Sequence, residues 1–61
     1  WVQAFEAELY DGSSTVRLIF LGRREVPGVE AGRHLVAEGL VAQIDGDLVI
    51  FNPRYELRVH A

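Results

Sequence analysis

The stretch that decides the fold is Val16-Arg17-Leu18-Ile19-Phe20-Leu21-Gly22, an almost continuous apolar run that begins soon after Gly12. Runs of about four to eight β-branched and aromatic residues between turn signals are typical of β-strands. The run therefore predicts a central strand over 16–21. Arg17 is its single charge, and Arg23 and Arg24 follow directly. Because the most apolar strand leads into the densest positive charge of the chain, we expect the functional site at this junction.

The residues before this run alternate between apolar and polar. The alternation has the period of two of a half-buried strand, and it predicts a strand near 2–10. Asp11-Gly12 then separates two strand-like segments, and this dipeptide is a strong hairpin signal because glycine readily adopts positive φ. Across that hairpin, Arg17 should share a face with Glu6 and Glu8. A surface ion pair is therefore the simpler interpretation of Arg17, and a contact to phosphate is the alternative.

The second half of the chain contains two further strand-like segments, separated by the hairpin signal Asp45-Gly46. Gly39 interrupts the first of them and predicts a bulge, a bend or a close approach of two backbones. Proline and glycine break up 23–32 and leave room for one helical turn at most. We therefore expect one all-β domain over 1–61, with strands near 2–10, 16–21, 34–42 and 48–52 and an extended tail from Arg54.

Length and composition limit what this domain can be. A chain of 61 residues buries only roughly 60% of its unfolded surface, so its stability should be marginal. It has no cysteine, so its 49% hydrophobic residues must supply the stabilisation. No run approaches the roughly 18 apolar residues of a membrane span, and no signal peptide is evident, so we expect a cytoplasmic protein. The chain opens at Trp1 inside a predicted strand, and we interpret it as a fragment.

The residue types that carry catalysis lack the neighbours they need. His34 and His60 have neither cysteines nor a helix-spaced acid beside them, so we predict no metal site. Ser13 and Ser14 lie in a turn without a base at a recognisable spacing. Gly28 belongs to a glycine-containing segment that lacks the lysine and the following helix of a phosphate loop. We therefore predict no enzymatic activity, no cofactor and no small-molecule substrate.

Four apolar side chains should lie on the outer faces of the predicted strands, namely Val36, Leu40, Val49 and Phe51. Monomeric proteins rarely expose a contiguous apolar patch of this kind. We therefore expect a missing strand, a second copy of the chain or a neighbouring domain to cover it.

Short motifs follow one another in a telling order along nearly the whole chain. They are Asp11-Gly12, the run 16–24, Pro27-Gly28-Val29-Glu30-Ala31-Gly32, Glu38-Gly39 and Asn52-Pro53-Arg54-Tyr55-Glu56-Leu57. In this order they resemble the small OB-fold nucleic-acid-binding domains of bacteria, especially those of actinobacteria. Those domains are similar in turn to the wedge OB domain of RecG-type branch-migration helicases.

The resemblance implies a small antiparallel Greek-key barrel that lacks its first strand, since the first of five strands would precede Trp1. It also implies that the strand over 16–21 lies beside the last strand. Arg23 and Arg24 would then approach Arg54 and Tyr55. Guanidinium groups contact phosphates and a tyrosine ring can stack on a base. The predicted nucleic-acid-binding residues are thus Arg17, Arg23, Arg24, Arg54 and Tyr55, with single-stranded DNA or RNA as the ligand.

The charge of the chain favours a different interpretation. The net charge of -3 and the pI near 5.1 count against phosphate binding, which depends on clustered positive charge. The arginines would then be solvated or paired with Glu25 and Glu56, and Tyr55 would pack on the barrel. In that case the chain is a structural or protein-protein interaction module, whose incomplete barrel and outer apolar face associate with another chain, as a homo-oligomer, or with a neighbouring domain.

Overall fold

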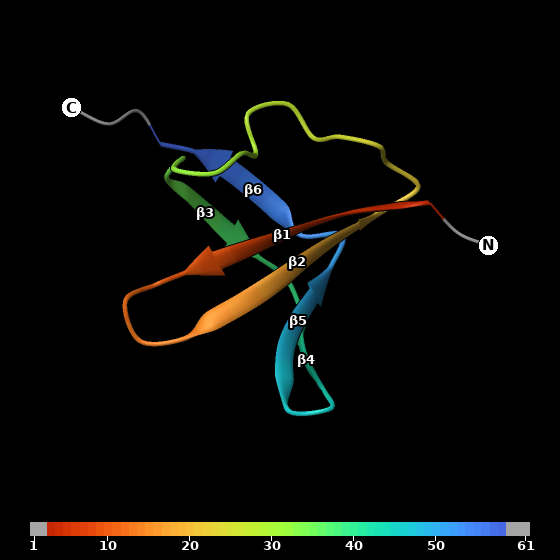
Figure 1. The fold of residues 1–61 in the computed structure, drawn as a ribbon, viewed down its shortest axis with the longest axis vertical. Coiled ribbons are helices and arrows are strands. Elements are labelled where there is room, and N and C mark those ends of the chain that lie inside the picture. Colours follow the sequence, from red (N-terminus) through yellow and green to blue (C-terminus); the bar gives the residue numbers. More distant parts are fainter. Residues whose placement is uncertain (1–2, 59–61) are drawn as a thin grey trace.

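The computed structural model describes residues 3–58, which form six strands in two sheets (Figure 1). The strands are β1 (Ala4–Tyr10), β2 (Thr15–Leu21), β3 (Leu35–Glu38), β4 (Val41–Ile44), β5 (Asp47–Phe51) and β6 (Arg54–Leu57). One sheet has the order β1-β2-β5-β4, and the other pairs β3 with β6. The prediction of an all-β domain is confirmed. Over the described residues the sheets do not close into a barrel.

The first hairpin forms where Asp11-Gly12 predicted it. One carboxylate oxygen of Asp11, Oδ1, accepts hydrogen bonds at 2.9 Å from the backbone N–H groups of Ser13 and Ser14, and from the Ser13 hydroxyl. Gly12 has a φ of 96°, which a residue with a side chain rarely adopts. The hydrogen bonds to Ser14 and Ser13 lower the pKa of Asp11, because they favour its charged form. The turn thus sets the register in which β1 and β2 pair.

The strand predicted over 16–21 is central, as expected. It pairs antiparallel with β1 and parallel with β5, so that Leu18 lies opposite Ile50. Leu18, Phe20 and Ile50 share the inner face of the sheet and are buried. Val26 and Val29, from the connection after β2, complete this core cluster. The inner face is therefore covered at the end of the sheet where β3, β6 and this connection lie (Figure 1).

The prediction of one strand over 34–42 is wrong, because the chain bends after Glu38 and forms β3 and β4 in different sheets. Gly39 lies at this bend, against the neighbouring strand. A Cβ atom there would lie 2.7 Å from Cγ2 of Ile50 and 3.8 Å from Cα of Pro53. Of the three alternatives that Gly39 predicted, the bend is therefore present, and the closest neighbouring atom belongs to the Ile50 side chain.

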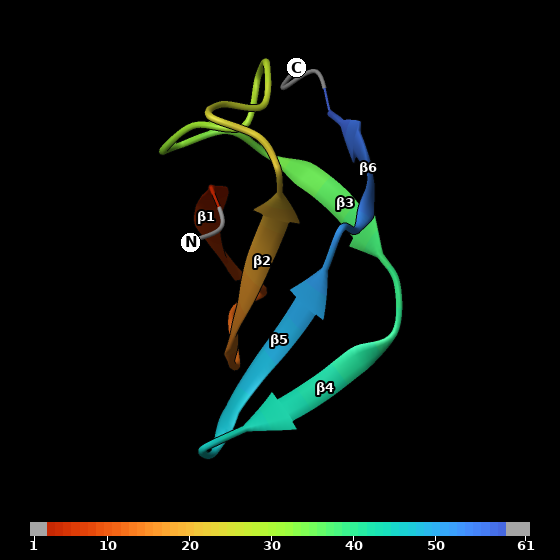
Figure 2. The ribbon, with the colours of Figure 1, turned by 90° about the vertical axis from the view of Figure 1, so that its right-hand side faces the viewer.

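The extended tail expected from Arg54 is a strand. Asn52 has a φ of 49°, and with Pro53 it ends β5 and turns the chain into β6. β6 then pairs antiparallel with β3. Figure 2 shows that β3 and β6 lie beyond the ends of β4 and β5. The chain therefore passes from the smaller sheet to the larger one between β3 and β4, and returns between β5 and β6.

Three of the four apolar residues expected on outer faces are exposed, at 44% for Val36, 93% for Leu40 and 45% for Phe51. Val49 also lies on the outer face, as predicted, but it is not part of an exposed patch, since only 1% of this residue is exposed. The register partners of Val49 on its two sides are Arg17 and Ala42. A central strand has neighbours on two sides, and their side chains enclose Val49.

Candidate nucleic-acid interface

The candidate site begins at a hydrogen-bonded junction between the end of β2 and the bend from β5 to β6. The side-chain oxygen of Asn52 accepts a hydrogen bond of 2.9 Å from the Leu21 N–H. The Asn52 N–H in turn donates to the carbonyl oxygen of Ile19 at 2.7 Å. Asparagine suits this position because it tolerates a positive φ and its short side chain reaches the neighbouring backbone. The junction fixes the two points from which the arginine-bearing segments leave.

Arg23 and Arg24 follow Leu21 by two and three positions, and both are exposed. Across residues 3–58 no carboxylate lies within 4 Å of either guanidinium group. Arg54 follows Asn52 by two positions, and its side chain is 87% exposed. Its Nε lies 3.7 Å from a carboxylate oxygen of Glu38, a contact of little energetic value at such exposure. Three solvated guanidinium groups therefore leave from one junction.

Tyr55 packs against the core. Its ring meets that of Phe20 edge to face, with 5.7 Å between the ring centroids. The residue is half-buried and belongs to the layer around the core cluster. The packing of Tyr55 on the sheet, which was the alternative to base stacking, is therefore present, and part of the ring surface is occupied by the protein itself.

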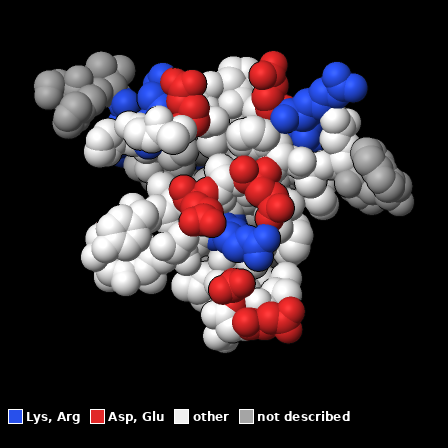
Figure 3. Space-filling view, in the orientation of Figure 1, with Lys and Arg blue, Asp and Glu red and all other residues white. Residues whose placement is uncertain are grey.

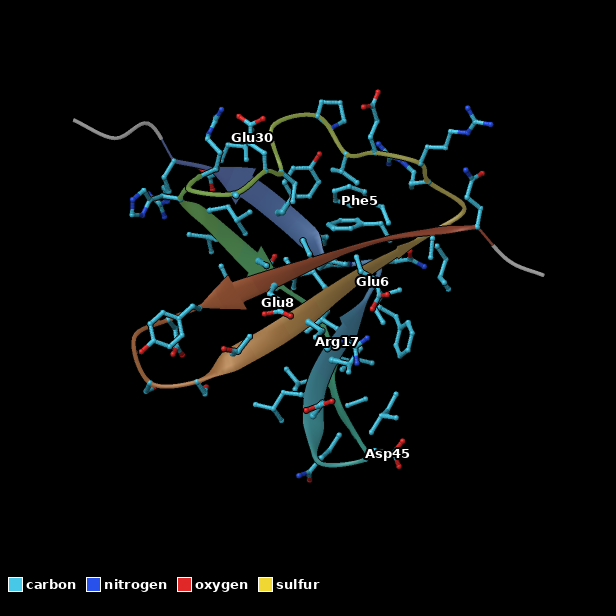
Figure 4. All side chains as sticks on the ribbon, in the orientation of Figure 1. Phe5, Glu6, Glu8, Arg17, Glu30 and Asp45 are labelled. Carbon is cyan, nitrogen blue, oxygen red and sulfur yellow. The ribbon has the colours of Figure 1, made fainter. Side chains whose placement is uncertain are left out.

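Arg17 is held by carboxylates on the outer face. It forms an ion pair with Glu6 of β1, and its Nη1 lies 3.7 Å from Oδ2 of Asp47 on β5. The hydrogen bond to Glu6 and the charge of that residue raise the pKa of Arg17. Figure 4 shows Glu6 and Glu8 projecting from β1 on the side of Arg17. The ion pair expected from the sequence is therefore present, and Arg17 lies in an open groove with three carboxylates along its lining, those of Glu6, Glu8 and Asp47.

The charges of the described residues are segregated along the molecule. The hairpins β1–β2 and β4–β5 carry five carboxylates and one arginine, namely Glu6, Glu8, Asp11, Asp45, Asp47 and Arg17. The connection after β2, together with β3 and β6, carries five arginines and four glutamates up to residue 58. Figure 3 shows, in its lower half, one basic side chain with acidic side chains around it, and further basic side chains at the upper end of the molecule. Positive charge therefore exceeds negative charge only in the part of the molecule that contains the junction.

Arg33 and Arg58 form a further pair of neighbouring basic residues, which the sequence analysis did not predict. The Arg58 N–H donates to the His34 carbonyl oxygen at 2.9 Å, which continues the pairing of β6 with β3 and brings Arg58 beside the segment that holds Arg33. Arg33 lies 3.6 Å from a carboxylate oxygen of Glu30. No sequence pattern indicated that Arg33 and Arg58 lie side by side, because this depends on β6, which was expected to be an unpaired tail.

Within residues 3–58 no group of three or more histidine, aspartate and glutamate side chains could hold a metal ion, and no helix is long and apolar enough to cross a membrane. His60 lies outside the described residues. The chain matches no protein family model, no curated protein and no solved structure.

Proposed function

We propose that this chain is a non-catalytic module that binds single-stranded nucleic acid through Arg23, Arg24 and Arg54. The observation that carries the proposal is the junction at Asn52, from which three exposed arginines leave. Within residues 3–58, Arg23 and Arg24 have no carboxylate within 4 Å, and Arg54 has only the exposed contact with Glu38. Solvated guanidinium groups are free to pair with phosphate oxygens, and each pairing releases condensed counterions. The acidic hairpins would lie away from the ligand, since carboxylates repel phosphates.

The arrangement of the strands supports the OB-fold part of this proposal. β2 lies parallel beside β5, which is the pairing that the OB resemblance implies for the third and fifth strands of that barrel. The pairs β1–β2 and β4–β5 are antiparallel. The sheet order β1-β2-β5-β4 supports the proposal, because the OB resemblance implies this order for the second, third, fifth and fourth strands.

Two of the five predicted residues have other roles in the proposed site. Arg17 is paired with Glu6 and Asp47, so it serves as a counter-ion for β1 and β5. Tyr55 packs on Phe20 and supports the bend that carries Arg54. Affinity should therefore come from phosphate contacts and should depend steeply on salt, with little preference for the sequence of the bases.

The proposal is tested by the salt dependence of binding. The affinity of the chain for a fluorescent single-stranded oligonucleotide is measured by anisotropy over a range of NaCl concentrations. Each phosphate neutralised on a single strand contributes about -0.7 to the slope of log K against log salt. The double variant R23A/R24A should therefore flatten the slope by between about one and two units.

A matched control variant distinguishes the loss of the proposed site from the loss of two positive charges elsewhere in the chain. R33A/R58A removes the same charge from Arg33, near the other end of the connection, and from Arg58, which follows β6 beside it. This variant should change the slope by less than about half a unit. Both variants remove exposed side chains, so the circular dichroism spectrum should remain that of the parent chain. An unchanged slope in R23A/R24A, or equal effects of the two double variants, would exclude this site.

A further inference from the structure

One edge of the larger sheet is unpaired along β1. β1 is an outer strand of the order β1-β2-β5-β4. The Gly22 N–H donates to the Gln3 carbonyl oxygen at 2.7 Å, and hydrogen bonding alternates along an antiparallel pair. Every second residue from Gln3 therefore directs its N–H and C=O toward β2. The residues between them, Ala4, Glu6, Glu8 and Tyr10, direct these groups away from β2, where no described strand pairs with them.

The inner face is also open at β4, the outer strand on the other side of this sheet. Val41, on the inner face of the other outer strand, is 57% exposed, and Gln43 beside it is exposed.

The side chains of β1 determine which strand can add to this edge. Glu6 and Glu8 stand on its outer face, and their backbone groups are the unpaired ones. If β1 paired antiparallel with β1 of a second copy about Ala7, Glu6 of each copy would face Glu8 of the other. Directly opposed like charges destabilise a sheet, whereas opposite charges stabilise it. The edge therefore disfavours a copy of itself and favours a strand with basic residues on its outer face.

We propose that the free edge of β1 binds an extended polypeptide segment from outside these 61 residues, in which apolar residues alternate with lysine or arginine. The apolar side chains of the segment would lie on the inner face beside Ala7 and Leu9, which are only partly buried. Its basic side chains would lie on the outer face opposite Glu6 and Glu8. The inference is independent of nucleic-acid binding, because it uses the acidic end of the molecule.

The experiment uses the 61-residue chain and a capped peptide of seven residues, the length of β1, in which lysine alternates with valine. Amide hydrogen exchange is followed by NMR for each residue. The peptide should slow exchange at Glu6 and Glu8 by about tenfold or more, because these amides gain partners. The amides of Ala7 and Leu9 already face β2 and should change less. A peptide with glutamate in place of lysine should bind at least about tenfold more weakly.

Two variants with the same change of charge test the specificity. E8K should abolish the preference for the lysine peptide, whereas E56K, on β6 of the other sheet, should retain it. R23A/R24A should leave peptide binding unchanged, so the two proposals can fail separately. The proposal is overturned if Glu6 and Glu8 gain no protection, if both peptides bind equally, or if protection arises from rising protein concentration alone, which would identify a second copy as the occupant.

Discussion

At the scale of single residues, Gly39 shows that a missing side chain can be a packing requirement. Its φ is not in the left-handed region, so only space excludes a larger residue there. A Cβ atom would lie 2.7 Å from Cγ2 of Ile50, a buried residue of the core. Intrinsic β-propensity would favour G39V by up to about 1 kcal/mol, but overpacking a core typically costs about 1–3 kcal/mol. We expect G39V to lower the free energy of unfolding by more than about 1 kcal/mol in urea titrations.

A double variant checks the mechanism of this loss. I50L removes the Cγ2 methyl group from the branch that faces Gly39. The pair G39A/I50L should therefore lose less stability than the sum of the single variants, which is the sign of a relieved contact. Additive losses, or a G39V chain as stable as the parent, would show that the bend does not depend on this contact.

At the scale of the strand elements, Asn52 joins β2 to the bend between β5 and β6. N52A should lose about 2 kcal/mol of unfolding free energy, because alanine is disfavoured at a φ of 49° and the Leu21 N–H loses its acceptor. N52D keeps a side-chain acceptor and tolerates this backbone conformation, so it should remain within about 0.5 kcal/mol of the parent. Equal stability of N52A and N52D in chemical denaturation would contradict this role.

At the scale of the whole molecule, the acidic hairpins depend on Arg17, the one arginine among five carboxylates. Removing its charge in R17M should destabilise the fold at low ionic strength, since Glu6, Glu8 and Asp47 would then repel one another. At about 1 M NaCl the Debye length falls to about 3 Å, so the difference from the parent chain should nearly vanish. The difference in stability is measured from the urea midpoints of R17M and of the parent chain at low and at high salt. A difference that is independent of salt would mean that Arg17 acts through packing alone.

Local signals predicted most of this fold. Alternation identified β1, and the dipeptides Asp11-Gly12 and Asp45-Gly46 identified both hairpins. Strand β6 was missed because its partner, β3, lies many residues earlier in the chain and a segment of four residues carries little periodicity of its own. The burial of Val49 was missed for a related reason. It depends on which strands flank β5, and a single strand's pattern does not contain that information.

In the candidate site, too, contacts within one hairpin could be predicted from the sequence, whereas contacts between distant segments could not. The exposure of Arg23 and Arg24 follows from a polar run after a strand, so the sequence could indicate it. The pairing of Arg17 with Glu6 could be predicted because one hairpin connects the two strands. The packing of Tyr55 on Phe20 stayed one of two alternatives, since it depends on how the second sheet lies against the first.

The parallel pairing of β2 with β5 also has a consequence for the order of folding. Both hairpins join strands that are close in sequence, and such hairpins form in roughly 1–10 μs. β2 and β5 instead pair Val16 with Leu48, 32 positions later, and contacts of such separation form slowly because a long loop must close first. The two hairpins should therefore form early as separate units. The pairing of β2 with β5, which the hydrogen bonds of Asn52 stabilise, is then the late step. This step creates the core and sets the folding rate of the domain.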